Sequence, residues 1–419
     1  MPPNPPHAAG SAASASGSSK SKSRGAAPPQ ILCAPEPLPA AFTASLFLAG
    51  GTGGWRRDAV QQIEQAGFDG LIFVPEPRSA PKAGAAAPER PLDAARLVQW
   101  QDEVLRHSDA LVLWLGEGGA GCPQLGELWG QWQRSARISI GAPPGTDSSL
   151  LRSAARLRIP VHTTLSDTVA HALSLLHPGA LRRGGERAVP LILWRSPGFH
   201  SWYKALRSAG HRLDDAHLEW SYRSKAAGRP PLLWALRPRV FLPSEHRHKS
   251  GEVVIGRSDI SATVLYFRQG LPSRLDTQIA LVREFRSAVR NQTGYGYMLP
   301  GGSAAQATER EQDARATALK EVSEETGLRL SPAQLEAVPV GNRQLSASLS
   351  CHHAHLFRAE LTPAQLQELQ ATAAAGRPLG ANPNERCFVI LRSLRELQND
   401  PDFDWSQLGM LLHALHDLP

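Results

Sequence analysis

The residues best suited to chemistry gather in one stretch, "LKEVSEETG", from Leu319 to Gly327. Within it Glu321, Glu324 and Glu325 stand at i, i+3 and i+4, so on a helix the three carboxylates share one face. Clusters of oxygen ligands suit Mg²⁺ or Mn²⁺, which bind carboxylates, water and substrate phosphates. The same spacing fits a solvated helix face, because glutamate is a good helix former. Spacing alone leaves both interpretations open.

A pair of glycines lies just before this stretch, in "YMLPGGS". Gly301 and Gly302 would let the backbone approach a bound ligand closely, because glycine has no Cβ. A strand-like segment, a glycine loop and a helix with a carboxylate face then follow one another along the chain. This order favours a metal–diphosphate site over a plain surface helix, with Gly301 and Gly302 among its substrate-binding residues.

The text "LPGG…ATALKEVSEETGL" resembles the signature of the Nudix hydrolases, which cleave nucleoside diphosphates linked to another moiety. The family pattern is G, five residues, E, seven residues, then R-E-U-x-E-E-x-G-U, where U is aliphatic. Residues 320–328 match its second half with lysine in place of arginine. The resemblance implies Mg²⁺ or Mn²⁺ as cofactor, Glu321, Glu324 and Glu325 as metal ligands, and Glu324 and Glu325 as catalytic residues.

The middle of the pattern is longer here. Gly302 to Lys320 spans eighteen positions where the family has fourteen, so the isolated glutamate of the pattern would fall on Gln312. Glu309 and Glu311 are neighbours that could replace it through a longer loop. In the family this glutamate and the arginine brace loop and helix, so the departure concerns loop geometry and rate more than metal binding.

A second segment points to one branch of that family. "TQIALVREFRSAV" (Thr277–Val289) precedes the glycine pair and resembles the ADP-ribose pyrophosphatase branch. Arg283 and Arg286 are therefore predicted to bind substrate, since a guanidinium group offers a fork of donors to phosphate oxygens. Surface arginines at a strand end are the alternative. The resemblance covers roughly residues 250–415, and the predicted domain is 251–415.

The implied reaction is metal-assisted hydrolysis, in which divalent ions neutralise a diphosphate and polarise the attacking water. A general base is needed. The candidates are a glutamate of the "KEVSEE" segment, Glu385 and the three histidines of "CHHAHLF", which are His352, His353 and His355. The residue pattern does not choose among them.

The first half of the chain has a different sequence pattern. Residues 1–38 are rich in small residues and proline, which predicts a disordered tail. Across residues 42–176 apolar strands alternate with helical patterns, which predicts a doubly wound α/β domain with a parallel sheet. Residues 177–188 contain proline and glycines and are predicted to be a linker. The predicted strands and helices of this domain are 42–51, 55–67, 68–77, 95–108, 109–117, 122–135, 137–144 and 164–176.

The glycine turn of this first domain follows a strand, in "LFLAGGTGGW". Parallel sheets bind ligands at such turns. Together with Asp109 before a buried strand and Glu127 entering a helix, this text resembles nucleoside 2-deoxyribosyltransferase-like proteins. The resemblance implies Glu127 as a carboxylate nucleophile at an anomeric carbon, with Gly50, Gly51 and Asp109 binding substrate. The segment "PQLGELWG" departs from the family text, since no hydroxyl residue precedes the glutamate.

Beyond residue 188, strand-like runs dominate. A strong helix is predicted at about 307–326, and a last one at "WSQLGMLLHALH". This mixture predicts an α+β domain with a mixed sheet over residues 251–415, the Nudix-type domain of the resemblance. Residues 189–250 are predicted to be an extension of that domain or an insert. The strand-like runs are "VPLILW", "LLWALRPRVFL", "GEVVIG", "SATVLYFR", "TQIALVREF", "HAHLFRAEL" and "RCFVILR".

The composition of the chain limits the kinds of partner that it can be expected to bind. The net charge of +7 is spread along the chain without a run of five or six like charges, so nucleic acid is not the expected partner. The four cysteines form no C-x-x-C pair, which argues against a disulfide framework or a zinc site and favours the cytoplasm. No apolar run is long enough for a membrane span. The expected partner is a nucleotide-derived small molecule, and a homodimer stays open.

Two functions follow from these observations. In the first, the C-terminal domain hydrolyses a nucleoside diphosphate-linked compound such as ADP-ribose or a dinucleotide with Mg²⁺, while the N-terminal domain binds or cleaves an N-glycosidic bond. In the second, both domains bind nucleotide as a sensor without turnover. The stretched segment before Lys320 and the altered text around Glu127 favour the second function. The match from Lys320 to Leu328 favours the first.

Overall fold

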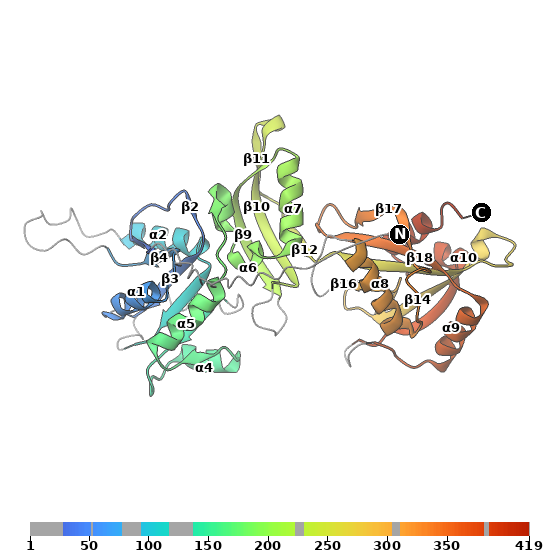
Figure 1. The fold of residues 1–419 in the computed structure, drawn as a ribbon, viewed down its shortest axis with the longest axis horizontal. Helices are drawn as coiled ribbons and strands as arrows, with labels where there is room; N and C mark the ends of the chain where they lie inside the picture. The colour runs from blue at the N-terminus through green and yellow to red at the C-terminus, as the bar shows by residue number, and fades with distance from the viewer. Residues whose placement is uncertain are drawn as a thin grey trace, which may run out of the picture.

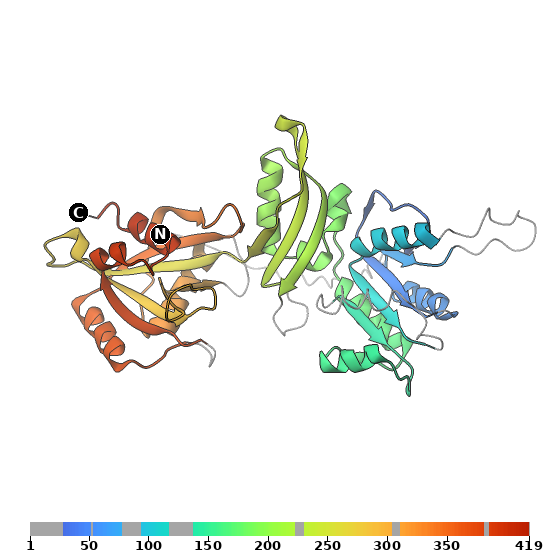
Figure 2. The same ribbon diagram turned by 180° about the vertical axis from the view of Figure 1, so that it is seen from behind.

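The computed structural model describes residues 28–51, 53–77, 94–116, 137–222, 230–303, 311–380 and 385–418. Figure 1 shows three bodies in a row: an N-terminal module (28–183), a middle module (184–257) and a C-terminal module (260–418). The view from behind in Figure 2 shows the same order. In the part of the chain so described, no helix is both long enough and apolar enough to cross a lipid bilayer.

The N-terminal module is built on a parallel sheet of six strands in the order β1-β4-β3-β5-β6-β7. The central strands are apolar and buried at every position, which is typical of a parallel sheet covered on both faces. The predicted parallel sheet is therefore confirmed. Its strands are β1 (Gln30–Cys33), β3 (Ser45–Gly50), β4 (Leu71–Val74), β5 (Ala110–Trp114), β6 (Ile138–Gly141) and β7 (Val161–His162).

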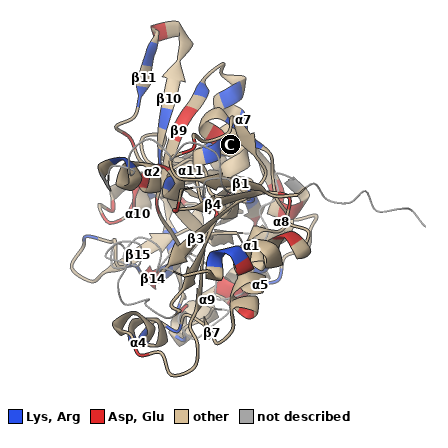
Figure 3. Cartoon of the chain, turned by 90° about the vertical axis from the view of Figure 1, so that its left-hand side faces the viewer, with Lys and Arg blue, Asp and Glu red and all other residues tan. Residues whose placement is uncertain are grey.

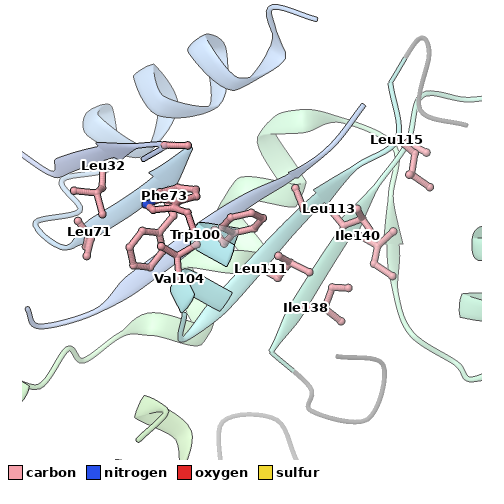
Figure 4. Packing of buried hydrophobic residues seen from close by; sticks show 14 of the residues in the cluster. Leu32, Leu71, Phe73, Trp100, Val104, Leu111, Leu113, Leu115, Ile138 and Ile140 are labelled. Atoms are coloured by element: carbon pink, nitrogen blue, oxygen red, sulfur yellow. The ribbon is translucent and has the colours of Figure 1, made fainter. Parts of the chain in front are cut away.

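Helices cover both faces of this sheet. Helices α1 (Trp55–Gln65) and α5 (Leu165–Leu176) pack on one face through Ile63 and Val169. Helices α2 (Ala94–Arg106) and α4 (Ser149–Arg156) pack on the other. Figure 4 shows this second core, where Trp100 and Val104 of α2 meet Phe73 and Leu111 of the sheet. The hydroxyl of Thr164 caps α5 by accepting from the Asp167 N–H, so the predicted start of that helix is confirmed.

Two predicted boundaries of this module are wrong. The tail does not reach residue 38, because "QILC" forms the edge strand β1 beside β4 and buries Leu32. Averaging composition over a proline-rich stretch hid this short apolar run. The predicted linker 177–188 is also ordered: β8 (Arg182–Arg183) pairs with β2 (Ala41–Phe42), and η2 (Gly184–Ala188) follows directly. Its arginine-rich text carries a buried ion pair, described below.

The middle module is a sheet with its own core, not a helical insert. Strand β10 pairs with β9 along one edge and with β11 and β12 along the other. Phe199, Tyr203 and Trp234 pack together in its core. The run "VPLILW" is a short helix rather than a strand, since it follows Pro190 at the N-cap position. The elements are α6 (Leu191–Trp194), α7 (Pro197–Ser208), β9 (Arg212–Tyr222), β10 (Leu233–Leu242), η3 (Pro243–Glu245), β11 (Arg247–Lys249) and β12 (Val254–Arg257).

The C-terminal module is built on a seven-stranded mixed sheet, as predicted, because β13 and β18 pair in parallel while the other pairs are antiparallel. Helices α8 and α9 cover one face, and α10 and α11 the other. The elements are β13 (Ile260–Phe267), η4 (Arg274–Asp276), β14 (Gln278–Phe285), β15 (Tyr295–Met298), β16 (Gly301–Ser303), α8 (Glu311–Thr326), β17 (Glu336–Gln344), β18 (His353–Glu360), α9 (Pro363–Ala375), β19 (Phe388–Ser393), α10 (Leu394–Asn399) and α11 (Trp405–Ala414).

Candidate functional site

Helix α8 carries the glutamates, and its buried stripe decides where they point. Ala314, Ala318 and Val322 follow one another at four-residue spacing and pack into the core under the sheet. Glu321 and Glu325 each come three positions after a stripe residue, so they flank the seam between helix and sheet. Figure 3 shows acidic residues of α8 in red. The carboxylates are thus held close to the sheet.

The two glycines of β16 make room for this arrangement in different ways. A Cβ on Gly301 would lie 2.2 Å from the backbone oxygen of Ser261, so only glycine lets β16 lie this close to β13. A Cβ on Gly302 would lie 2.6 Å from the carboxyl carbon of Glu321. The Glu321 carboxylate therefore rests directly on the strand. The sequence reasoning selected both glycines, and each has a steric reason to be glycine.

Glu325 is the most perturbed carboxylate of the group. Its Oε2 accepts a hydrogen bond from the Gly301 N–H at 2.9 Å. Burial, and then the nearby charges of Glu321 and Glu284, raise the pKa of Glu325 to about 8, and the Gly301 bond offsets only part of this. Burial is also the first cause of the raised pKa of Glu321, with Glu324 and Glu385 adding to it. Both carboxyl groups are therefore partly withdrawn from water, and neighbouring acids add to the rise of their pKa values.

Glu324 shares Lys320 with Glu321, whose Oε1 lies 4.0 Å from the Lys320 Nζ. The Glu324 carboxylate binds the ammonium group of Lys320 at 2.7 Å, one helical turn earlier. The Glu324 side chain is about one-third exposed and that of Lys320 is 62% exposed. This lysine stands at the arginine position of the family pattern. The three glutamates share a helix face as predicted, but only two of them lean on the glycine strand.

Among the described residues, no group of three or more His, Cys, Asp or Glu side chains encloses a metal position. The all-oxygen donor set nevertheless suits a hard divalent ion, which fills its remaining positions with water and phosphate oxygens. A divalent ion would favour the charged form of these carboxyl groups, whose pKa values are raised by burial and by neighbouring acids. Glu321, Glu324 and Glu325 would hold it.

Two residues near this group escaped the sequence reasoning. Glu284 lies on β14 with its side chain 10% exposed, and its charge adds to the raised pKa of Glu325. The Sγ atom of Cys387 lies 3.8 Å from the Glu284 Oε2 and 4.0 Å from the Glu325 Oε1. A glutamate close behind the apolar run "IALV" of the same strand was the available signal, because a buried carboxylate in a strand needs a reason.

The two predicted arginines lie in different environments. Arg286 binds the Glu284 carboxylate at 2.7 Å, and it lowers the pKa of Glu325, so it belongs to the carboxylate group. Arg283 alternates with Ile279 and Leu281, which pack toward α10 and α11 on the other face. Its guanidinium group lies over the rings of Tyr295 and Phe388. Only Arg286 is therefore on the side of the sheet that carries Glu325.

The candidates for a general base spread along the edge of the module. His355 lies 3.6 Å from Asp259, and the backbone N–H of His353 donates to Asp259 at 2.8 Å. His352 contacts the hydroxyl of Ser350. Glu385 is exposed, and its charge adds to the raised pKa of Glu321. Among these four, Glu385 is the one whose charge acts on the α8 carboxylates.

The segment before α8 is only partly described. Glu309 lies outside the described residues, as does the side chain of Glu311, whose backbone begins α8. Gln312, which stands where the family pattern has its isolated glutamate, is exposed on the first turn of the helix. The prediction that Glu309 or Glu311 replaces that glutamate stays a prediction.

In the N-terminal module, the glycine turn after β3 is closed by side chains of α1. Gly50 has φ +145°, and a Cβ there would lie 2.1 Å from the backbone oxygen of Trp114, so glycine permits the close pairing of β3 with β5. The Gly51 carbonyl accepts from the indole of Trp55 and the guanidinium of Arg56, each at 3.0 Å. These contacts order the turn without a ligand. Glu127 lies outside the described residues.

Asp109 is a structural residue in this geometry. Its carboxylate binds both terminal nitrogens of Arg182 and accepts from the backbone N–H groups of Ser45 at 2.9 Å and Leu191 at 2.8 Å. The side chain is 1% exposed and that of Arg182 is 0% exposed. Asp109 also precedes β5, whereas parallel sheets bind ligands at the carboxyl ends of their strands. A substrate does not reach this carboxylate here.

Comparison with known proteins gave structural neighbours only. No protein-family model matches the chain, and no curated protein matches it. Solved structures similar to part of the chain include a mutT/nudix family protein from Listeria innocua, with 20% identity and a TM-score of 0.26, covering 38% of this chain and 92% of that one. A MutT/nudix family protein from Enterococcus faecalis has 14% identity and a TM-score of 0.25, covering 38% and 61%. A NUDIX family hydrolase from Clostridium perfringens has 15% and 0.25, covering 39% and 99%.

Proposed function

We propose that the C-terminal module is a Mg²⁺- or Mn²⁺-dependent hydrolase of a nucleoside diphosphate-linked compound, of the Nudix type. One observation carries the proposal: Glu321 and Glu325 lie against the Gly301–Gly302 strand, and burial and neighbouring acids raise their pKa values. A surface helix would leave these carboxylates in water at ordinary pKa values. ADP-ribose and dinucleotides are the first substrates to test, from the sequence resemblance around Arg283 and Arg286.

In this proposal the residues divide the work. When bound, a divalent ion supplies Lewis-acid charge at the diphosphate and at the attacking water. Glu321, Glu324 and Glu325 hold it, and the Gly301 N–H orients the Glu325 carboxylate. Lys320 must release Glu324 for that purpose, or share it. Arg286, fixed by Glu284, presents its donors to a phosphate group, and Glu385 is the proposed proton acceptor at the exposed edge.

For the N-terminal module we propose nucleoside binding at the carboxyl ends of β3 and β5. A Cβ on Gly50 would lie 3.1 Å from the ring of Trp55 and 2.1 Å from the backbone oxygen of Trp114, so both tryptophans lie beside this turn. Flat indole rings suit a base. Glu127 as the nucleophile at an N-glycosidic carbon belongs to this proposal, and it is tested by release of free base from nucleosides.

The hydrolase proposal is tested with full-length protein and a panel of ADP-ribose, dinucleotides and nucleotide-sugars. With Mg²⁺ present we expect release of a nucleoside monophosphate from at least one of them. Glu324→Gln and Glu325→Gln should each lower kcat about 100-fold, since losing a metal ligand removes about 3 kcal/mol of transition-state stabilisation. Glu368→Gln on the exposed face of α9 is the matched control and should retain full activity.

A nucleotide sensor is the second candidate, and the longer segment between Gly302 and Lys320 favours it. The same panel separates the two functions. Tight binding of ADP-ribose by the wild-type chain without any product, with or without Mg²⁺ and Mn²⁺, identifies a sensor. Turnover that is equal in wild type, Glu324→Gln and Glu325→Gln sinks the hydrolase proposal at this site.

A further inference from the structure

The sheet of the middle module packs its core on one face. Leu236 and Val240 of β10 lie in that core with residues of α7, and so does Leu218 of β9. Figure 1 shows α7 along this sheet. Side chains alternate along a strand, so the residues between these positions lie on the opposite face. Strand β12 belongs to the same sheet, because it pairs with β10, and the predicted domain start at residue 251 therefore falls inside this module.

Two aromatic rings stand on the opposite face. Trp220 of β9 pairs with Ala235 of β10, which lies between two core residues, so the Trp220 side chain points away from the core. Tyr222, two positions further along β9, points the same way. Trp220 is 46% exposed and Tyr222 is 63% exposed. In the part of the chain that is described, no other ring or guanidinium group lies over either of them, whereas Phe241 on the same face is covered by Arg212 at 4.8 Å. The two rings are free to stack on a ligand.

Cationic side chains continue the same face. Arg237 and Arg239 of β10 alternate with its core positions, and His217 of β9 pairs with Arg237, so all three lie beside the rings and are exposed. Arg237 forms a half-exposed pair with Glu219, which contributes little to stability. Arg239 has no ion pair within the described ranges, although Asp215 is opposite it in the strand register. Strand pairing gathers these cations, so no run of like charges marks them in the sequence. We call this surface the open face, and its members are Trp220, Tyr222, His217, Arg237 and Arg239.

We propose that the open face binds single-stranded nucleic acid. Aromatic rings stack on bases of any sequence, and arginines beside them bind the phosphate backbone. Trp220 and Tyr222 stand about 7 Å apart along β9, a spacing that suits successive bases of an extended strand. A duplex keeps its bases inside the helix, so it offers these rings nothing to stack on. A symmetric dimer through this face would bring the arginines of two copies together, which like charges oppose. The proposal is independent of the hydrolase at the C-terminal module.

The test uses the full chain and fluorescence anisotropy with short labelled oligo-dT and oligo-U, and with a duplex of the same length. Trp220→Ala and Tyr222→Ala should each weaken binding of the single strands roughly 5- to 100-fold, since stacking of one base on an aromatic ring contributes on that scale. Trp220→Phe and Tyr222→Phe keep a ring and should recover most of the affinity. Trp405→Ala is the matched control, because this tryptophan of the C-terminal module is 87% exposed.

The arginines are tested through salt. Arg239→Gln should reduce the slope of log affinity against log salt concentration by about 0.7, the contribution of one phosphate contact in a single strand. Arg392→Gln replaces an exposed arginine on β19 of the C-terminal module and should leave the slope unchanged.

Equal affinity of Trp220→Ala and Trp405→Ala overturns the proposal, as does wild-type protein that binds neither oligonucleotide or binds the duplex as tightly as the single strands. Sedimentation velocity tests the other occupant. A wild-type dimer that Trp220→Ala converts to a monomer, without binding of oligonucleotides, assigns the open face to a second copy of the chain and also overturns the proposal. Thermal unfolding of each variant separates lost binding from misfolding. If Trp220→Ala is destabilised, the two Tyr222 variants and the salt slope of Arg239→Gln decide.

Discussion

Two carboxylates in this chain have opposite surroundings: Asp109 is buried, and Glu325 is partly buried. Asp109 in the N-terminal module is matched by Arg182 and by two backbone N–H groups. Glu325 in the C-terminal module has one N–H, from Gly301, and shares its surroundings with other acids. A fully matched carboxylate stabilises a fold, while an under-matched one costs stability and persists where function needs it. The contrast separates a structural from a candidate functional position.

The largest effect should come from breaking the matched pair. Asp109→Ala should lower the free energy of unfolding by about 3–5 kcal/mol, because Arg182 is left as a buried charge without a partner. Asp147→Ala is the control in the same module, since the Arg152–Asp147 pair is exposed and should contribute less than about 1 kcal/mol. Urea denaturation followed by fluorescence measures both. Equal effects of the two substitutions would contradict the structural role of Asp109.

In metal-free protein, Glu325 should make the free energy of unfolding depend on pH. The pKa of Glu325 is raised to about 8 in the folded state, above its ordinary value of 4.5, so the folded chain binds the extra proton. Its contribution to stability is therefore full below about pH 4.5 and is lost as pH rises toward 8. We expect a loss of about 2 kcal/mol over this range, less than ideal linkage gives, because buried groups relax.

Glu325→Gln removes this titration and should flatten the stability curve between pH 5 and 8. The comparison is made in EDTA by urea denaturation at several pH values, with Glu368→Gln as control. Added Mg²⁺ should restore stability to the wild type at pH 8 and not to Glu325→Gln. Parallel curves for wild type and Glu325→Gln would show that Glu325 titrates normally.

The smallest effect should come from one methyl group. Gly302→Ala places a Cβ 2.6 Å from the carboxyl carbon of Glu321, the movable end of a side chain, so the carboxylate shifts while the fold stands. We expect about tenfold weaker Mg²⁺ activation with little change in the unfolding midpoint. Gly301→Ala meets the Ser261 backbone instead and should destabilise the fold more. A reversed ranking of the two substitutions in stability would refute this division of roles.

Elements with strong periodicity could be predicted from the sequence, and contacts between distant elements could not. The apolar strand before Trp114 and the helix that ends at Thr326 follow from local pattern. The contact of Gly302 with Glu321 was foreseeable in type, because a glycine pair preceded a carboxylate helix. The meeting of Asp109 with Arg182 was not, since 73 positions separate them and the arginine lay in text that reads as a linker.

The same limit applies to the site. Glu284 and Cys387 join it through strand pairing, because β14 pairs with β19. Strand alternation separates Arg283 from Glu284, so the side of the sheet on which each lies could be inferred only once the faces were known. Charged residues chosen because they lie near a motif in the sequence therefore include some, such as Arg283, that lie on the wrong face of their strand. The same choice misses residues of the neighbouring strand, such as Cys387.

The hydrogen bonds of Ile255 in β12 bear on how this chain can be cut. Its N–H donates to the Leu349 carbonyl and its carbonyl accepts from the Cys351 N–H, each at 2.9 Å, while the same strand pairs with β10. Strand β12 is thus hydrogen-bonded both to the middle module and to the C-terminal module. Truncations that begin at residue 251 or 258 would leave unpaired backbone hydrogen-bonding groups on one fragment. Gene fusions and chimaeras should therefore keep residues 184–418 together.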